Sequence, residues 1–129
     1  MGFESGGLAI AHSVHNGLTT LPETHHFLHG EKVAFGLLVQ LVCEGKPTSL
    51  INEVLKFSTS VGLPVSLKQV GVTDVARARL QTVAERSCAP GETAHNEPFE
   101  VNSALLLDAI IAVDAIGSEY FMAKSTRIR

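Results

Sequence analysis

The stretch that most constrains the fold is GEKVAFGLLVQLVCEG, residues 30–45, because it is apolar on nearly every side after Lys32. A helix without a polar face must be surrounded by other elements, so we expect this stretch to be buried all round or covered by a partner. Apolar residues before it also recur at helical spacing: Leu8, Ala11, Val14 and Leu18. The sequence therefore predicts an all-α helical bundle.

The bounds of the helices follow from apolar spacing and from residues that start and stop helices. Helices are predicted over residues 5–18, 29–45, 47–62, 73–87 and 104–122, with a loop or short turn at 19–28. Ser5 and Thr73-Asp74 are candidate N-caps, and Gly62-Leu63-Pro64 is a candidate stop. We expect one helical domain over residues 1–123 and a frayed basic tail, KSTRIR, at 124–129.

Composition and charge exclude several classes of protein. The net charge is -3 and no Lys/Arg cluster stands out, which argues against nucleic acid or an anionic membrane as a partner. The apolar stretches at 33–43 and 104–115 are too short to span a bilayer. The two isolated cysteines, Cys43 and Cys88, are typical of reduced thiols, and no secretory signal is visible, so we expect a cytoplasmic protein.

Five of the six histidines lie between residues 6 and 30. His12 and His15 are three residues apart and share a helix face, and an antiparallel hairpin would bring His29 back toward them. Imidazoles from two adjacent helices suit a first-row metal ion, usually zinc. A competing pair is His25 with His29, if residues 21–30 are helical. Glu4, Glu23 and Glu31 are the carboxylates nearest in sequence as candidates for a further ligand, and no spacing selects one of them.

Other catalytic arrangements have weaker support. Cys43 lies in an apolar run that raises a thiol pKa, and nothing in the sequence places Cys88 beside His95. Gly6-Gly7 could cradle an anion or could let two backbones approach closely. No GxGxxG or P-loop motif occurs, so the sequence predicts no nucleotide site.

Several motifs together resemble one family. The segments GFESGGLAIAHSVHNGLT, HHFLHGEKVAFG, VGLPVSLKQVGV and AERSCAPGETAHNEPF resemble NAD-dependent glycerol dehydrogenases, zinc enzymes of the iron-containing alcohol dehydrogenase superfamily. The resemblance covers nearly the whole chain. It implies an all-helical C-terminal domain, without the N-terminal α/β domain that binds NAD in the family.

The resemblance also implies roles for individual residues. The two histidine ligands of the family match His12 and His29, while the third ligand, an upstream Asp, has no counterpart here. His15 matches a catalytic-site histidine near the nicotinamide and substrate, and Phe3 matches an aromatic residue near the substrate pocket. The implied reaction is oxidation of glycerol by NAD to dihydroxyacetone.

Three functional hypotheses follow. The first is the zinc-binding part of a glycerol dehydrogenase, expected to be inactive as this chain alone because Met1 stands where the family is in mid-chain. The second is a non-catalytic helical module for interaction or subunit assembly. The third is part of a related diol or hydroxy-acid dehydrogenase.

Apolar surface at 33–42 and 3–8 is expected to be exposed and to cause self-association, and homo-oligomers are common in the family.

Overall fold

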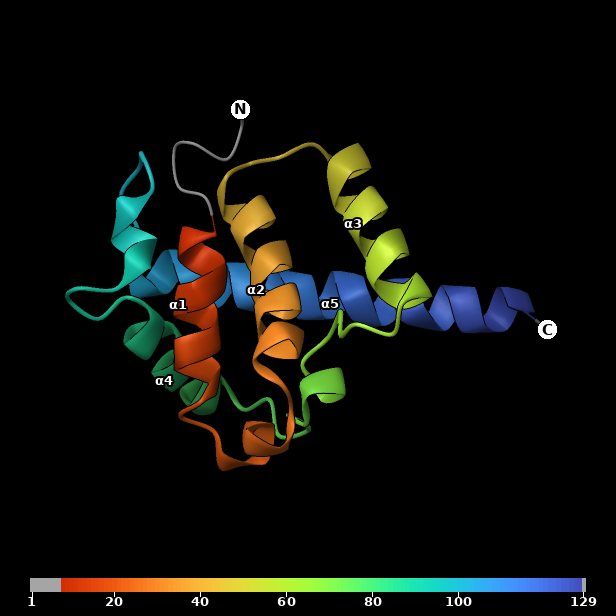
Figure 1. The fold of residues 1–129 in the computed structure, drawn as a ribbon, viewed down its shortest axis with the longest axis horizontal. Helices are drawn as coiled ribbons and strands as arrows, with labels where there is room; N and C mark the ends of the chain where they lie inside the picture. Colours follow the sequence, from red (N-terminus) through yellow and green to blue (C-terminus); the bar gives the residue numbers. More distant parts are fainter. Residues whose placement is uncertain (1–7, 129) are drawn as a thin grey trace.

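The computed structural model describes residues 8–128, with side chains as far as Ala123. Within this range it contains five α-helices and three short 3₁₀ helices, and no β-strand (Figure 1). The α-helices are α1 (Ala9–Leu18), α2 (His29–Cys43), α3 (Thr48–Ser60), α4 (Arg77–Ser87) and α5 (Ser103–Ile128). The 3₁₀ helices are Pro22–His26, Lys68–Val70 and Thr93–Asn96. The predicted all-α class is confirmed.

Several helix bounds differ from the sequence prediction, three of them by four residues or more. Helix α1 begins at Ala9 and not at residue 5. Helix α4 begins at Arg77 and not at Thr73-Asp74. The reason is local: Asp74 Oδ1 accepts the Ala76 N–H at 3.2 Å, which closes a turn ahead of the helix. The backbone of α5 continues past residue 122 to Ile128. The tail predicted at 124–129 has its side chains outside the described part of the chain.

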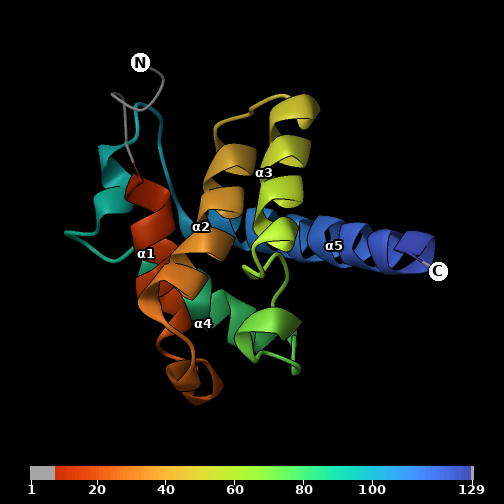
Figure 2. The ribbon, with the colours of Figure 1, turned by 45° about the vertical axis from the view of Figure 1, so that its right-hand side comes forward.

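The helices form a compact arrangement around α5. Helices α1 and α2 make an antiparallel hairpin through residues 19–28, and α1, α2 and α3 lie side by side across α5 (Figures 1 and 2). Helix α4 packs against both α1 and α5. None of the described helices combines the length and apolarity needed to cross a membrane.

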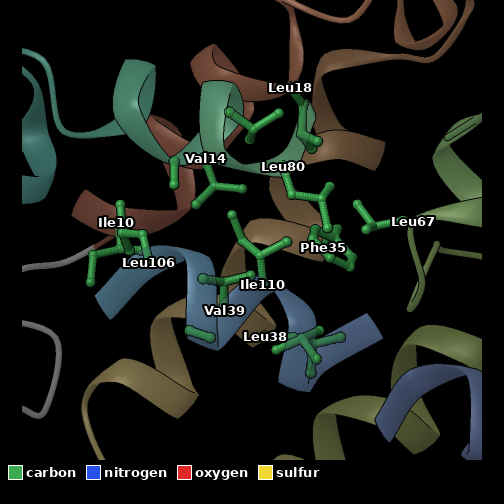
Figure 3. Close-up of a cluster of buried hydrophobic side chains, with 14 of the residues drawn as sticks. Ile10, Val14, Leu18, Phe35, Leu38, Val39, Leu67, Leu80, Leu106 and Ile110 are labelled. Atoms are coloured by element: carbon green, nitrogen blue, oxygen red, sulfur yellow. The ribbon is translucent and has the colours of Figure 1, made fainter. Parts of the chain in front are cut away.

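The core lies where α1, α2, α4 and α5 converge (Figure 3). Phe35 and Val39 of α2 and Ile110 of α5 are completely buried there. The opposite side of α2 is less covered, since Val33, Ala34 and Leu37 are only half-buried and line a groove toward α3. The expectation that this helix is buried all round therefore holds for its core side only.

Helix α2 approaches α1 very closely at one glycine. A Cβ atom at Gly36 would lie 2.6 Å from the Ala11 carbonyl oxygen, closer than any side chain allows. Beside this contact the Ala11 N–H donates to Gln40 Oε1 at 3.1 Å, a buried bond between the two helices. The contact fixes both the spacing and the register of α1 and α2.

A buried acid, Glu97, lies near the C-terminal end of α2. Glu97, between the third 3₁₀ helix and α5, is 6% exposed, and neither of its carboxylate oxygens has a hydrogen-bond partner among the described residues. Burial, followed by the nearby Glu44 carboxylate, raises the pKa of Glu97 to about 7. The protonated form of Glu97 is therefore the one that the folded chain favours below neutral pH.

Replacing Gly36 by alanine tests the helix contact. We expect Gly36→Ala to lower the free energy of unfolding by about 1–3 kcal/mol, because the added methyl forces α1 and α2 apart. The matched control is Gly30→Ala in the same helix, where a Cβ meets nothing within 4 Å. The control should be neutral or stabilising by up to about 1 kcal/mol. Urea denaturation measures the free energy of unfolding of both variants. Equal values would contradict the close approach of α1 and α2 at Gly36.

The pKa of Glu97 predicts a pH dependence of stability. Because its folded-state pKa is raised, the contribution of Glu97 to stability is fully present below about pH 4.5 and lost as pH rises through about 7. We expect Glu97→Gln to remove this loss. Urea denaturation at pH 5 and at pH 8 gives the free energy of unfolding of both proteins, and the decrease between the two pH values should be smaller in the variant than in the wild type. Glu100→Gln, at an exposed neighbouring position, is the control. An unchanged pH dependence in Glu97→Gln would contradict the account.

Candidate metal centre

Three imidazoles gather where α1 meets the start of α2. His12 and His15 lie on one face of α1, and His29 is the first residue of α2. The ring centres of His12 and His29 are 5.7 Å apart, and those of His15 and His29 are 4.1 Å apart. His12 and His29 are exposed, whereas His15 is half-buried. The hairpin therefore brings together the three residues that the sequence singled out.

The start of α2 is held in place by its own first turn. The Leu28 N–H donates to Glu31 Oε1 at 2.7 Å, which caps the helix one residue before His29. This bond orients the backbone from which the His29 ring projects toward α1.

Ring geometry distinguishes the two histidine pairs. A zinc–nitrogen bond is about 2.0–2.1 Å, so two imidazoles of a tetrahedral site have ring centres about 5.2 Å apart. The His12–His29 separation of 5.7 Å is close to this value, whereas the His15–His29 separation of 4.1 Å is too short. In addition, His15 Nε2 and His29 Nδ1 are hydrogen-bonded to each other at 3.1 Å. The donor set of His12 and His29 thus fits a shared metal ion better than the other pair does.

A complete ligand set is not found in the described part of the chain, where no three or more His, Cys, Asp and Glu side chains are arranged to hold a metal ion. Glu31 is engaged at the Leu28 N–H, and Glu23 forms an ion pair with Arg79 at 2.6 Å. Glu4 lies outside the described residues. Of the three carboxylates considered from sequence, the two that the structure describes are thus committed to other contacts.

Asn16 connects His15 to Glu92, a residue of the segment that follows α4. His15 Nδ1 lies 3.2 Å from Asn16 Oδ1, and Asn16 Nδ2 donates to both carboxylate oxygens of Glu92, at 3.1 and 3.3 Å. Burial lowers the pKa of His15; the Asn16 bond opposes this shift and His29 adds to it. His15 is therefore favoured as a neutral imidazole.

Glu92 is the acceptor on which several donors converge. Ser13 Oγ donates to it at 3.1 Å, and Arg86 forms an ion pair with it. Burial opposes ionisation of Glu92, but the hydrogen bonds from Arg86, Asn16 and Ser13 outweigh it and lower its pKa. Sequence reasoning missed Asn16 and Glu92; the only local signal was the His15-Asn16 adjacency, because Glu92 lies 76 residues further along.

The remaining histidines lie apart from this cluster. His25 Nε2 lies 2.8 Å from the Thr19 carbonyl oxygen, so the competing pair of His25 with His29 does not form. His95 Nε2 contacts the backbone carbonyl of Cys88 at 2.8 Å and not its thiol.

The two cysteines are free and half-buried. Burial raises the pKa of the Cys43 thiol to about 12 and that of Cys88 to about 11, which disfavours the nucleophilic thiolate.

Two sequence predictions, Phe3 near a substrate pocket and a role for Gly6-Gly7, fall outside the described residues. Beside His12 an open hollow of about 360 Å³ is lined by Leu8, Ala9, Thr93 and Asn96.

Comparison with known proteins gives the relatives of the chain. No protein-family model matches it. The chain is 51% identical over 117 residues to a glycolaldehyde reductase from Halobacterium salinarum, a match that covers 91% of this chain and 32% of the relative. It is 48% identical over 120 residues to a glycerol dehydrogenase from Pseudomonas putida, covering 93% and 33%. The solved structure of glycerol dehydrogenase from Schizosaccharomyces pombe matches with a TM-score of 0.87 at 38% identity, over 96% of this chain and 32% of that one.

Sequence and fold thus agree that the chain is a homologue of dehydrogenases and reductases. In particular, it corresponds to an all-helical part of glycerol dehydrogenases, so the resemblance inferred from the motifs is confirmed. The chain spans about a third of the length of the curated relatives it matches.

Proposed function

We propose that this chain is the zinc-binding helical part of a cytoplasmic glycerol dehydrogenase, in which His12 and His29 are metal ligands. The observation that carries the proposal is the pair of exposed imidazoles on two helices, with ring centres 5.7 Å apart, in a chain 48% identical to a glycerol dehydrogenase. The complete protein would convert glycerol and NAD to dihydroxyacetone and NADH.

Each part of the proposed centre has a chemical role. A bound zinc ion would supply Lewis acidity toward a substrate hydroxyl, and NAD would serve as the hydride acceptor. His12 and His29 would hold the ion from adjacent helices. A catalytic zinc site has three protein ligands, so the third ligand and the NAD site would come from parts of the protein beyond these residues.

The neighbouring residues support a site for a small polar substrate. The hollow beside His12 offers the Asn96 side chain, which can hydrogen-bond a hydroxyl group. The Thr93 hydroxyl also lines it but donates to the Ala9 carbonyl at 2.7 Å, so it can only accept. We assign His15 to the substrate and nicotinamide side of the centre, and Phe3 to the substrate pocket, as the family resemblance implies. Because one relative is a glycolaldehyde reductase, other small hydroxy or carbonyl compounds are alternative substrates.

A second candidate function is a non-catalytic module for interaction or subunit assembly. The observation that favours it is an apolar groove of about 460 Å³ between α2 and α3, lined by residues that include Val33, Leu37 and Phe57. Phe57 is 62% exposed, which is unusual for a large aromatic side chain without a partner surface.

Zinc titration of the purified chain tests the ligand assignment. We expect His12→Ala and His29→Ala each to weaken zinc binding at least about tenfold in calorimetry, because each removes a metal–nitrogen bond. His26→Ala is the matched control, since it removes an exposed imidazole from the segment that joins α1 to α2. A zinc affinity that neither ligand substitution changes would contradict the assignment and favour the non-catalytic module.

An activity assay tests whether the chain alone is sufficient to oxidise glycerol. We expect the 129-residue polypeptide, supplied with zinc, NAD and glycerol, to form no NADH, because it contributes two of three ligands and no nucleotide motif. A complete glycerol dehydrogenase assayed in parallel is the positive control. NADH formation by the purified chain would overturn this expectation.

A further inference from the structure

A continuous hydrogen-bond chain leads from Glu92 to the imidazole proposed as a metal ligand. It passes from the Glu92 carboxylate to Asn16, from Asn16 to His15, and from His15 to His29. The three links measure 3.1, 3.2 and 3.1 Å between heavy atoms. Each link joins groups whose donor and acceptor capacities are known, so the direction of every bond can be worked out.

The direction is set at the Glu92 end. An ionised carboxylate only accepts hydrogen bonds, and Glu92 also receives donors from Arg86 and Ser13. The Asn16 group that faces Glu92 must therefore be its NH₂, which donates to both carboxylate oxygens. Consequently the amide oxygen of Asn16 faces His15.

The same argument continues through the two imidazoles. A neutral imidazole carries one N–H and one bare nitrogen. Because Asn16 offers an oxygen, His15 must carry its proton on Nδ1, which leaves Nε2 as an acceptor. The Nδ1 of His29 must then donate to His15 Nε2, and the lone pair of His29 is on its Nε2.

We propose that Glu92 is a positioning residue that fixes the tautomer of His29, so that Nε2 of His29 is the nitrogen available to a metal ion. The proposal rests on the ligand role of His29 under the proposed function. The nitrogen that is protonated in a histidine ligand is determined by the bond that its other nitrogen makes. Here that partner is His15, and the tautomer of His15 depends on the Glu92 carboxylate two links away.

The tautomers can be read directly in the metal-free chain. With ¹⁵N-labelled histidine, long-range ¹H–¹⁵N spectra at about pH 8, well above the ordinary pKa of a free imidazole, identify the protonated nitrogen of each ring. We expect the proton on Nδ1 in both His15 and His29. In Glu92→Gln the replacement amide can both donate and accept, so Asn16 is no longer forced into one orientation. We then expect His29 to populate both tautomers and zinc affinity to fall about two- to tenfold, in proportion to the lost fraction of the Nδ1-protonated form.

Glu85→Gln is the matched control, because it removes an exposed carboxylate of α4 whose hydrogen bond, from Gln81, lies within that helix. We expect it to change neither the tautomers nor the zinc affinity. A proton on Nε2 of His29 in the wild type, or a His29 tautomer unaffected by Glu92→Gln, would overturn the proposal. The expected tautomers in a chain that binds no zinc would support the positioning role while contradicting the ligand role, so the two failures are distinguishable.

Discussion

The geometry of the candidate centre depends on how closely α2 approaches α1. The two backbones are near contact at Gly36 and Ala11, where even one extra carbon atom would not fit. Because the helices are antiparallel and joined by a short segment, this spacing also determines how far the first residue of α2 lies from the middle of α1. The imidazoles of His12 and His29 meet as a result, without any direct bond between them that would fill their metal-binding nitrogens.

The polar residues of α1 form two groups with different contacts. His12 and His15 present imidazoles toward the start of α2, whereas Ser13 and Asn16 form a half-buried polar network with the segment that follows α4. Ser13 belongs to that network twice, since it donates to Glu92 and accepts the Ala94 N–H at 2.8 Å. Charge held at Glu92 is thus connected to the imidazoles through Asn16 rather than through the apolar core. The fold separates the group that orients the centre from the surface where a metal ion would enter.

Much of this structure is predictable from the sequence, but only where the determining contacts are local. Apolar periodicity and the stop at Gly62 predict the helices, and the three-residue spacing of His12 and His15 predicts a shared face. The start of α4 was wrong by about one turn because a side-chain bond from Asp74 competes with the helix. The role of Glu92 was missed because its partners lie on helices α1 and α4. A contact that forms only in the folded chain leaves no periodic pattern in the sequence.

The central claim is that one metal ion is held by imidazoles from both α1 and α2. Zinc K-edge X-ray absorption of the zinc-loaded chain tests it most directly, because scattering from imidazole rings is distinct from scattering by water. The account predicts two imidazole nitrogens per zinc at about 2.0–2.1 Å, reduced to one in His29→Ala. A spectrum with only oxygen neighbours, or one left unchanged by that substitution, would contradict it.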